Sequence, residues 1–159
     1  MRRVLASASP RRRQILETLG IPFDVVPSAA DEAPIAGLTP AALAERWAMD
    51  KAQEVAGREA GLVLGADTIV VVDKRVLGKP RDNNDAADML RRLSDRWHEV
   101  ITGVALASEG SLHAFSVATR VRFRALSEAR IERYVATGEG RDKAGAYAVQ
   151  GIGAGLVTR

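Results

Sequence analysis

The chain has 159 residues, of which 47% are hydrophobic and 27% charged, a balance typical of one globular domain with a buried core. It contains no cysteine and two histidines, which excludes disulfides, thiol nucleophiles and zinc–thiolate sites; any metal site must use mainly carboxylate oxygens, which favours Mg²⁺ or Mn²⁺. The net charge of +3 fits an anionic ligand, but aromatic residues make up only 4%, too few for a single-strand nucleic-acid binder.

Strand and helix patterns alternate along the chain. The first half predicts a strand over residues 2–8, a helix over 9–20, a strand over 22–28, a loop over 29–40, a helix over 40–57, and one bent strand or a strand pair over 61–73. The second half predicts a partner strand over 75–80, a helix over 83–95, a hairpin over 98–126 that turns near 109–110, a helix over 127–140, and a glycine-rich loop with a short strand over 143–159. The series predicts a single domain over residues 1–159 of the α/β class, with a mixed twisted sheet and flanking helices.

The segment "SASPRRR" places three arginines at the start of the first helix, for which Ser9 is the expected N-cap. A helix N-terminus carries a partial positive charge and unpaired N–H groups, so cations there are unfavourable unless an anion binds. Arginine binds phosphate oxygens through paired hydrogen bonds, so Ser7, Ser9 and Arg11–Arg13 are a candidate polyphosphate cradle. Because successive residues lie about 100° apart around a helix, the three arginines cannot all face one ligand. The alternative is a set of solvated surface charges. The apolar face expected for this helix consists of Ile15, Leu16 and Leu19.

Asp67 lies inside the apolar run "LVLGADTIVVV". A carboxylate in such surroundings is costly unless it is paired, hydrogen-bonded or bound to a metal. Together with Glu32, from the loop after the second strand, it could complete a two-carboxylate Mg²⁺ site. The alternative is a turn aspartate between two short strands, with Gly65 in the turn.

Two lysines are candidate partners for such a site. A hairpin that turns at "DKR" would pair Val72 with Val76 and Ile69 with Lys79, which places Lys79 on the face of Asp67. The alternative is an exposed lysine before a proline.

The long helix puts Lys51 on an apolar stripe at successive four-residue steps. Lys51 either extends along that face to solvent or reaches into a phosphate site. The other members of the stripe are Leu43, Trp47 and Val55.

The strand "RVRFRAL" alternates Arg120, Arg122 and Arg124 with Val121 and Phe123. This pattern predicts one basic face and one buried face. A solvated face is the simpler interpretation, and a nucleic-acid surface is the alternative.

An arginine cradle, two carboxylates and two lysines suit metal-assisted attack of water on a polyphosphate. Four segments of the chain are distinctive in combination, namely "LASASPRRRQIL", "GADTIVVVDKRVLGKPRD", "HEVITGVAL" and "DKAGAYAVQGIGAG". They resemble, in the same order, the signature blocks of the Maf family of nucleotide pyrophosphatases. The resemblance implies a fold with two lobes around a central cleft, related to the inosine triphosphatase-like fold. It also implies hydrolysis of a nucleoside triphosphate to the monophosphate and pyrophosphate.

The resemblance also implies roles for individual residues. The catalytic and polyphosphate-side positions are Asp67, Glu32, Lys79, Lys51 and Arg12, with Asp67 and Glu32 as the metal ligands for Mg²⁺ or Mn²⁺. The other substrate-binding positions are Ser7 and Ser9 in the cradle and Arg11, Thr68 and Gln150 for base selectivity. The motifs "GADT" and "YAVQG" look like those of the subfamily that acts on dTTP and UTP.

Two alternatives remain open: the same reaction on a modified purine such as methylated GTP, and a non-enzymatic division regulator that binds protein or nucleic acid. The resemblance further suggests a homodimer.

No apolar run approaches the length of a membrane span and no signal-peptide pattern begins the chain, so we expect a cytoplasmic protein without membrane contact. Family members usually continue beyond "GLV" with a further loop and helix, so we expect that C-terminal segment to be absent.

Overall fold

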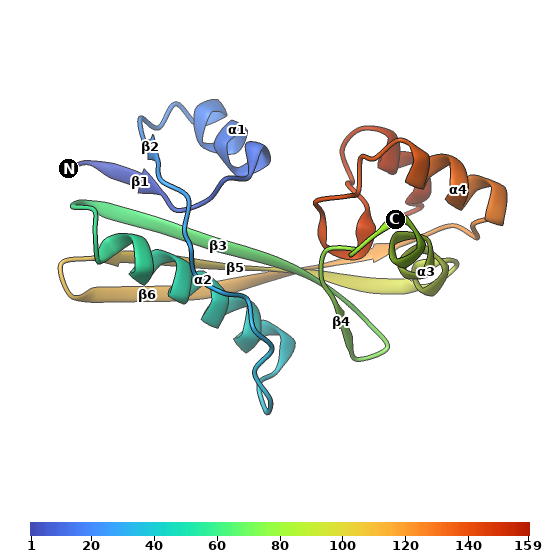
Figure 1. Cartoon of the computed structure of the whole chain (residues 1–159), viewed down its shortest axis with the longest axis horizontal. Coiled ribbons are helices and arrows are strands. Elements are labelled where there is room, and N and C mark those ends of the chain that lie inside the picture. The colour runs from blue at the N-terminus through green and yellow to red at the C-terminus, as the bar shows by residue number, and fades with distance from the viewer. The chain divides into compact units, whose positions relative to one another are not determined.

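The strands form one six-stranded mixed sheet in the computed structural model, which describes all residues 1–159 (Figure 1). They are β1 (Arg3–Leu5), β2 (Asp24–Val25), β3 (Leu62–Val72), β4 (Arg75–Leu77), β5 (Trp97–Ser108) and β6 (Ser111–Arg122). The hydrogen-bonded order is β2-β1-β3-β5-β6, with β4 paired to β3. β1 runs parallel to both β2 and β3, whereas β4 is antiparallel to β3. The predicted α/β class and mixed sheet are therefore confirmed.

Each α-helix begins where a side-chain cap precedes it. The helices are α1 (Pro10–Thr18), α2 (Pro40–Ala56), α3 (Asn83–Leu93) and α4 (Glu128–Ala136), and two short 3-10 helices follow at Ala144–Ala146 and Ile152–Leu156. The side chains that accept the first free N–H groups are those of Ser9, Thr39, Asp82 and Ser127. These bonds satisfy donors that the helix itself leaves unpaired, so local sequence sets the starting points. No helix combines the length and the apolar character needed to cross a membrane.

Helix α1 differs from its predicted packing. None of its residues is buried: Ile15 and Leu19 are exposed and Leu16 is half-buried. The apolar stripe expected for this helix is therefore not part of the core. Its first turn is fixed instead by polar bonds around Ser7 and Ser9.

The chain divides into two compact units, each with an apolar core. Unit 1 consists of Met1–Asp67 and Thr102–Val117, and unit 2 of Thr68–Ile101 and Ala118–Arg159. The core of unit 1 is built from small side chains, which allow α2 to lie close to the strands. Its buried members are Val4, Ala6, Ala48, Ala52, Val55, Val63, Ala105 and Ala107.

The core of unit 2 has larger side chains and includes the facing surfaces of α3 and α4 (Figure 1). Three rings meet edge to face in it: His98, Phe123 and Tyr147, with centroids 4.7 to 5.5 Å apart. The Nε2 atom of His98 lies 2.6 Å from the Tyr147 hydroxyl, while its Nδ1 atom is buried without a hydrogen-bond partner. Burial lowers the pKa of His98 from 6.5 to about 4, so this side chain is held neutral.

We expect unit 2 to lose stability as the pH falls below 6.5. The unfolded chain binds a proton at His98 near pH 6.5, whereas the folded chain resists it until about pH 4, so stability present above pH 6.5 is lost through that window. Between pH 7.5 and pH 5 the loss is about 2 kcal/mol. Urea unfolding at both pH values should show this loss in the wild type and not in His98→Gln. His113→Gln, at the other and exposed histidine, is the control and should keep it.

Candidate active site

Asp67 lies in the middle of β3, which is one continuous strand and not a pair joined by a turn. Only 5% of the residue is exposed. Its Oδ1 atom accepts a hydrogen bond from Lys51 Nζ at 2.8 Å, and its Oδ2 atom is buried without a partner. Burial raises the pKa of Asp67 above its ordinary value, opposed by Lys51 and assisted by the charge of Glu32. A buried carboxylate with an unshared oxygen and a raised pKa is a candidate general base. The turn-aspartate interpretation is therefore wrong.

Lys51 joins the two predicted carboxylates. It projects from α2, and only 12% of its side chain is exposed. Its Nζ atom donates to Glu32 Oε1 at 2.6 Å as well as to Asp67 Oδ1 at 2.8 Å. The interpretation in which Lys51 extends to solvent is wrong, because two carboxylates hold its ammonium group at the site.

Two glycines let α2 lie against the sheet and thereby set the reach of Lys51. A Cβ atom at Gly65 would overlap the carbonyl oxygen of Ala48 and lie 2.8 Å from the nitrogen of Ala52. A Cβ atom at Gly103 would likewise overlap the carbonyl oxygen of Ala44. The backbone of α2 is thus in contact with β3 and β5. The side chain of Lys51 is therefore long enough to reach from α2 to the carboxylate of Asp67 on β3.

Gly65→Ala should therefore weaken the Lys51–Asp67 pair, although the added methyl group contacts neither side chain. The added methyl group must push α2 away from β3, and overpacking of this kind costs about 1–3 kcal/mol. We expect a lower urea midpoint and a weaker Lys51–Asp67 pair, measured as a shift of the Lys51 amine resonance by NMR. Gly155→Ala is the control for a glycine substitution, because Gly155 is exposed, has no positive φ, and a Cβ atom there meets nothing within 4 Å. An unchanged Lys51 signal in Gly65→Ala would contradict this account.

Glu32 reaches Lys51 from the segment between β2 and α2. Its side chain is 40% exposed, so it is the more accessible of the two carboxylates. The next residue, Ala33, is tied to α2, since its carbonyl oxygen accepts a bond of 3.1 Å from Trp47 Nε1. This bond orients the loop that carries Glu32.

The first turn of α1 brings a guanidinium group to the same region. Arg12 Nη1 donates to Ser7 Oγ at 3.1 Å, and Ser7 Oγ also accepts from the nitrogen of Ser9 at 3.2 Å. Burial lowers the pKa of Arg12, opposed by the negative charges of Asp67 and Glu32, so Arg12 lies within electrostatic range of both carboxylates. The structure therefore brings the start of α1 and the two carboxylates together in unit 1.

The neighbouring arginines take other directions. Arg13 forms an ion pair of 2.8 Å with Glu17 one turn along the helix, and Arg11 is exposed. The angular spacing predicted this divergence. Of the three, Arg12 is the one whose guanidinium group is bonded to Ser7 and interacts electrostatically with both carboxylates.

Lys79 is not placed by the register that the sequence predicts. Val72 pairs with Arg75, not with Val76. A slip of one residue reverses the face of every later side chain, and β4 ends before Lys79. The argument that put Lys79 on the face of Asp67 is therefore wrong. Lys79 belongs to unit 2, whereas Asp67 is the last residue of the first part of unit 1.

Thr68 and Gln150 also belong to unit 2. Thr68 follows Asp67 in β3, so its half-buried side chain points to the opposite face of the strand. Gln150 is exposed in the loop between the two 3-10 helices. The predicted residues that the structure assembles in unit 1 are Ser7, Ser9, Arg12, Glu32, Lys51 and Asp67.

The carboxylates fit one kind of metal site. Glu32 and Asp67 both contact a single cation position, that of Lys51 Nζ, and Asp67 Oδ2 has no other partner. No group of three or more His, Cys, Asp or Glu side chains that could hold a metal is present. Such a donor set suits Mg²⁺ that takes its remaining ligands from water and phosphate oxygens, and it does not suit an all-protein cage.

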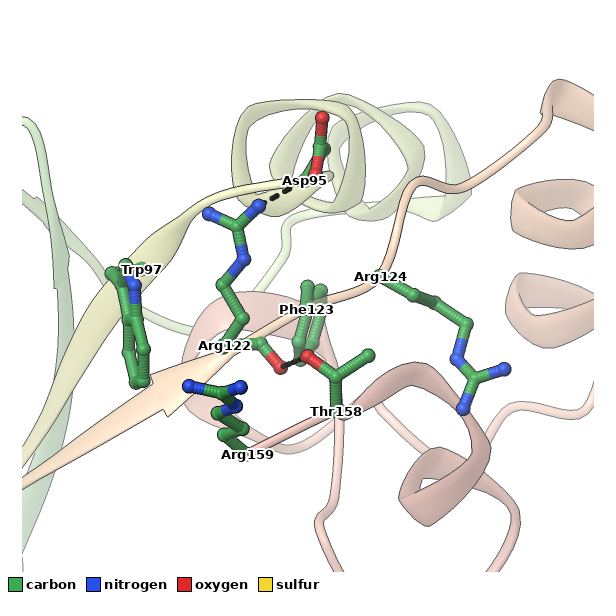
Figure 2. A pocket seen from close by; sticks show the side chains of 7 residues that line it. All are labelled: Asp95, Trp97, Arg122, Phe123, Arg124, Thr158 and Arg159. Carbon is green, nitrogen blue, oxygen red and sulfur yellow. Dashed lines mark hydrogen bonds and ion pairs between the residues drawn. The ribbon is translucent and has the colours of Figure 1, made fainter.

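The basic strand lines a separate groove of unit 2, shown in Figure 2. Val121 and Phe123 are buried, as the alternation predicted. Arg122 pairs with Asp95 at 2.7 Å, and Arg120 stacks 4.6 Å from the ring centroid of Trp97. These two arginines therefore have partners within the protein.

Comparison with known proteins agrees with the resemblance of the motifs. The family model described as Maf-like protein matches residues 2–159. The chain belongs to the Maf family. This Maf chain is 52% identical over 157 residues to the dTTP/UTP pyrophosphatase of Pelotomaculum thermopropionicum, with 97% of the chain and 82% of the relative covered. It is 54% identical over 160 residues to the dTTP/UTP pyrophosphatase of Moorella thermoacetica, with 97% and 81% covered.

A solved structure supports the fold of this Maf chain. The Ham1 protein of Staphylococcus aureus matches with a TM-score of 0.55 at 15% identity, over 77% of the Maf chain and 72% of that protein. At this identity the likeness shows the fold alone. It agrees with the expected fold class.

Sequence reasoning missed what positions the site. The signal was present as alanines four residues apart in α2 facing a glycine in β3, a pattern that indicates close approach of helix and strand. One of the two interpretations of the sequence places Gly65 in a turn. In the structure it is the contact point between β3 and α2.

Proposed function

We propose that this chain is a nucleoside triphosphate pyrophosphatase that acts on dTTP and UTP. A water molecule attacks the α-phosphorus, the bond from that phosphorus to the bridging oxygen breaks, and the products are the nucleoside monophosphate and pyrophosphate. The observation that carries the proposal is the Glu32–Lys51–Asp67 bridge beside Arg12. The names of relatives that are about half identical to the chain support the same reaction and substrates.

The residues of unit 1 divide the work between charge neutralisation and proton transfer. Arg12 and the free N–H groups at the start of α1 bind phosphate oxygens, with Ser7 holding the guanidinium in place. Lys51 leaves Glu32 when phosphate arrives and neutralises an oxygen of the polyphosphate. Asp67 accepts the proton of the attacking water, because burial raises its pKa and its Oδ2 atom has no other partner.

Glu32 and Asp67 would hold a divalent cation, Mg²⁺ or Mn²⁺. Bound there, the cation would supply charge neutralisation at the phosphates. The protein offers two carboxylates for this, and the substrate offers the other oxygens. Both carboxylates also bind Lys51, so the cation and the ammonium group compete for the same oxygens.

Base selectivity is assigned to Arg11, Thr68 and Gln150, with Lys79 on the polyphosphate side. The amide of Gln150 both donates and accepts hydrogen bonds, which matches the carbonyl and ring N–H of thymine or uracil. A homodimer, which the family resemblance implies, and a cytoplasmic location, expected from the sequence, complete the proposal.

The test is pyrophosphate release from dTTP, UTP, CTP, GTP and methylated GTP, each with Mg²⁺, with Mn²⁺ and with EDTA. The proposal expects release from dTTP and UTP with metal, and little with EDTA. Faster release from methylated GTP would replace the substrate assignment. No release from any nucleotide would overturn the proposed reaction.

A further inference from the structure

The end of the loop Ala148–Gly153 in unit 2 is held by one carboxylate, that of Glu139. Glu139 Oε1 accepts from the nitrogen of Gly153 at 2.8 Å, and Oε2 accepts from the nitrogen of Ile152 at 3.0 Å. Burial would raise the pKa of Glu139, but these bonds together with one from Tyr134 outweigh it and lower the pKa. The carboxylate is therefore ionised and pairs with the loop backbone at both oxygens.

Tyr134 links Glu139 to the first residue of the loop, Ala148. Its buried hydroxyl donates to Glu139 Oε1 at 3.0 Å and accepts from the nitrogen of Ala148 at 3.0 Å. The two side chains thus hold the loop at its start, Ala148, and at its end, Ile152 and Gly153. Both come from α4 or the turn just after it, so the loop is fastened to a helix.

Two glycines make this close approach possible. Gly151 has a φ of +104°, and a Cβ atom there would lie 2.7 Å from Glu139 Oε2. A Cβ atom at Gly153 would overlap the carbonyl oxygen of Ala148 and lie 2.9 Å from the Tyr134 hydroxyl. Larger residues would separate the loop from Glu139 and Tyr134.

The fastened loop presents an amide between two apolar side chains. Gln150 is exposed at its centre, and Val149 and Ile152 are 49% and 61% exposed. A nucleobase offers an apolar face for such side chains and polar edge atoms for an amide. The backbone is fixed from one side, while these three side chains remain open to a ligand.

We propose that Glu139 and Tyr134 are positioning residues that set base selectivity by fixing the loop that carries Gln150. This inference rests on the proposed pyrophosphatase function. Neither residue touches the nucleotide. They act through the backbone of residues 148–153, because the position of this backbone sets the position of the Gln150 amide at the edge of the base.

The test compares Glu139→Gln and Tyr134→Phe with the wild type and with Glu132→Gln, a matched control on the exposed side of α4. A glutamine at 139 has one acceptor oxygen where the carboxylate has two, so it loses a bond to the loop. We expect KM for dTTP to rise about tenfold in both variants, with kcat changed less than threefold. The preference for dTTP over dCTP in kcat/KM should fall by about the same factor. The control should match the wild type.

Amide hydrogen exchange of residues 149–153 separates the possible failures. Faster exchange together with the KM and selectivity changes supports the inference. Faster exchange with wild-type KM and selectivity overturns it, because the loop then has no bearing on the base. Unchanged exchange overturns it too, because the bonds then do not fix the loop. If the wild type releases no pyrophosphate from any nucleotide, the proposed function fails, and the inference with it. Thermal unfolding of each variant confirms that the fold is retained.

Discussion

Asp67→Asn should lower kcat for pyrophosphate release by about 100- to 10,000-fold, the range that a general base contributes. Asparagine keeps the shape of the side chain but cannot take a proton from water at neutral pH. At saturating Mg²⁺, KM should change little, because Arg12 and Lys51 still bind the phosphates and Glu32 still offers a carboxylate to the cation. Initial rates with dTTP, together with thermal unfolding, measure both effects.

The control for this substitution is Asp50→Asn, which removes a carboxylate from the same unit at its 3.0 Å ion pair with Arg46 on the surface of α2. This variant should keep wild-type kcat. Folding of Asp67→Asn should also be retained, since the substitution removes a buried charge and leaves Lys51 paired with Glu32. A folded Asp67→Asn enzyme with wild-type turnover would refute the role of Asp67.

Lys51→Met should lower both stability and activity. Removing one partner of a buried ion pair leaves the other uncompensated, which costs about 3 kcal/mol. Without Lys51 the pKa of Asp67 should rise further, because the opposing charge is gone and burial remains. The acid limb of the pH–rate profile should therefore move to higher pH, and the stability deficit should shrink as the pH falls and Asp67 takes up a proton.

Arg46→Met is the matched control, a cation on α2 whose partner Asp50 is at the surface. A surface pair of this kind contributes about 0–1 kcal/mol, so this variant should unfold near the wild-type midpoint. Equal midpoints for Lys51→Met and Arg46→Met would contradict the buried bridge. An unmoved pH–rate profile would show that Lys51 does not control the protonation of Asp67.

The parts of the fold that depend on local chemistry could be predicted. Ser9 is the expected N-cap of α1 and forms that bond, and the last helix, predicted to begin at residue 127, is capped by Ser127 at that position. The turn of the β5–β6 hairpin at Glu109–Gly110 was likewise predicted, because an apolar alternation is interrupted there by a glycine.

The register of β3 and β4 could not be predicted by the same means. Their connection consists of Asp73 and Lys74, both with positive φ, so the loop has two residues. Such loops usually contain Asn-Gly or Asp-Gly, and the segment "VDKRV" has neither. Without a glycine to mark the turn, the sequence allows more than one centre.

In the candidate site, too, local sequence identified the residues but not the contacts between them. Asp67 and Lys51 each stood out as a charge in apolar surroundings, so local sequence identified both. Their pairing joins residues 16 positions apart, and that of Lys51 with Glu32 joins residues 19 apart. The distance between them depends on how closely α2 approaches β3, which is a property of the packed fold.

That close approach has an evolutionary consequence. The spacing of Asp67 and Lys51 rests on backbone meeting backbone at Gly65 and Gly103, with no large side chain between. Substitutions that resize side chains outside this contact and outside the small-residue core of unit 1 leave this spacing unaltered. Glu32, by contrast, lies on a connecting segment. The bond that holds this segment to α2 is made by the neighbouring residue, Ala33, whose carbonyl oxygen accepts from the indole of Trp47. Substitutions in the loop can therefore change the position of Glu32 during evolution while the Lys51–Asp67 pair is kept.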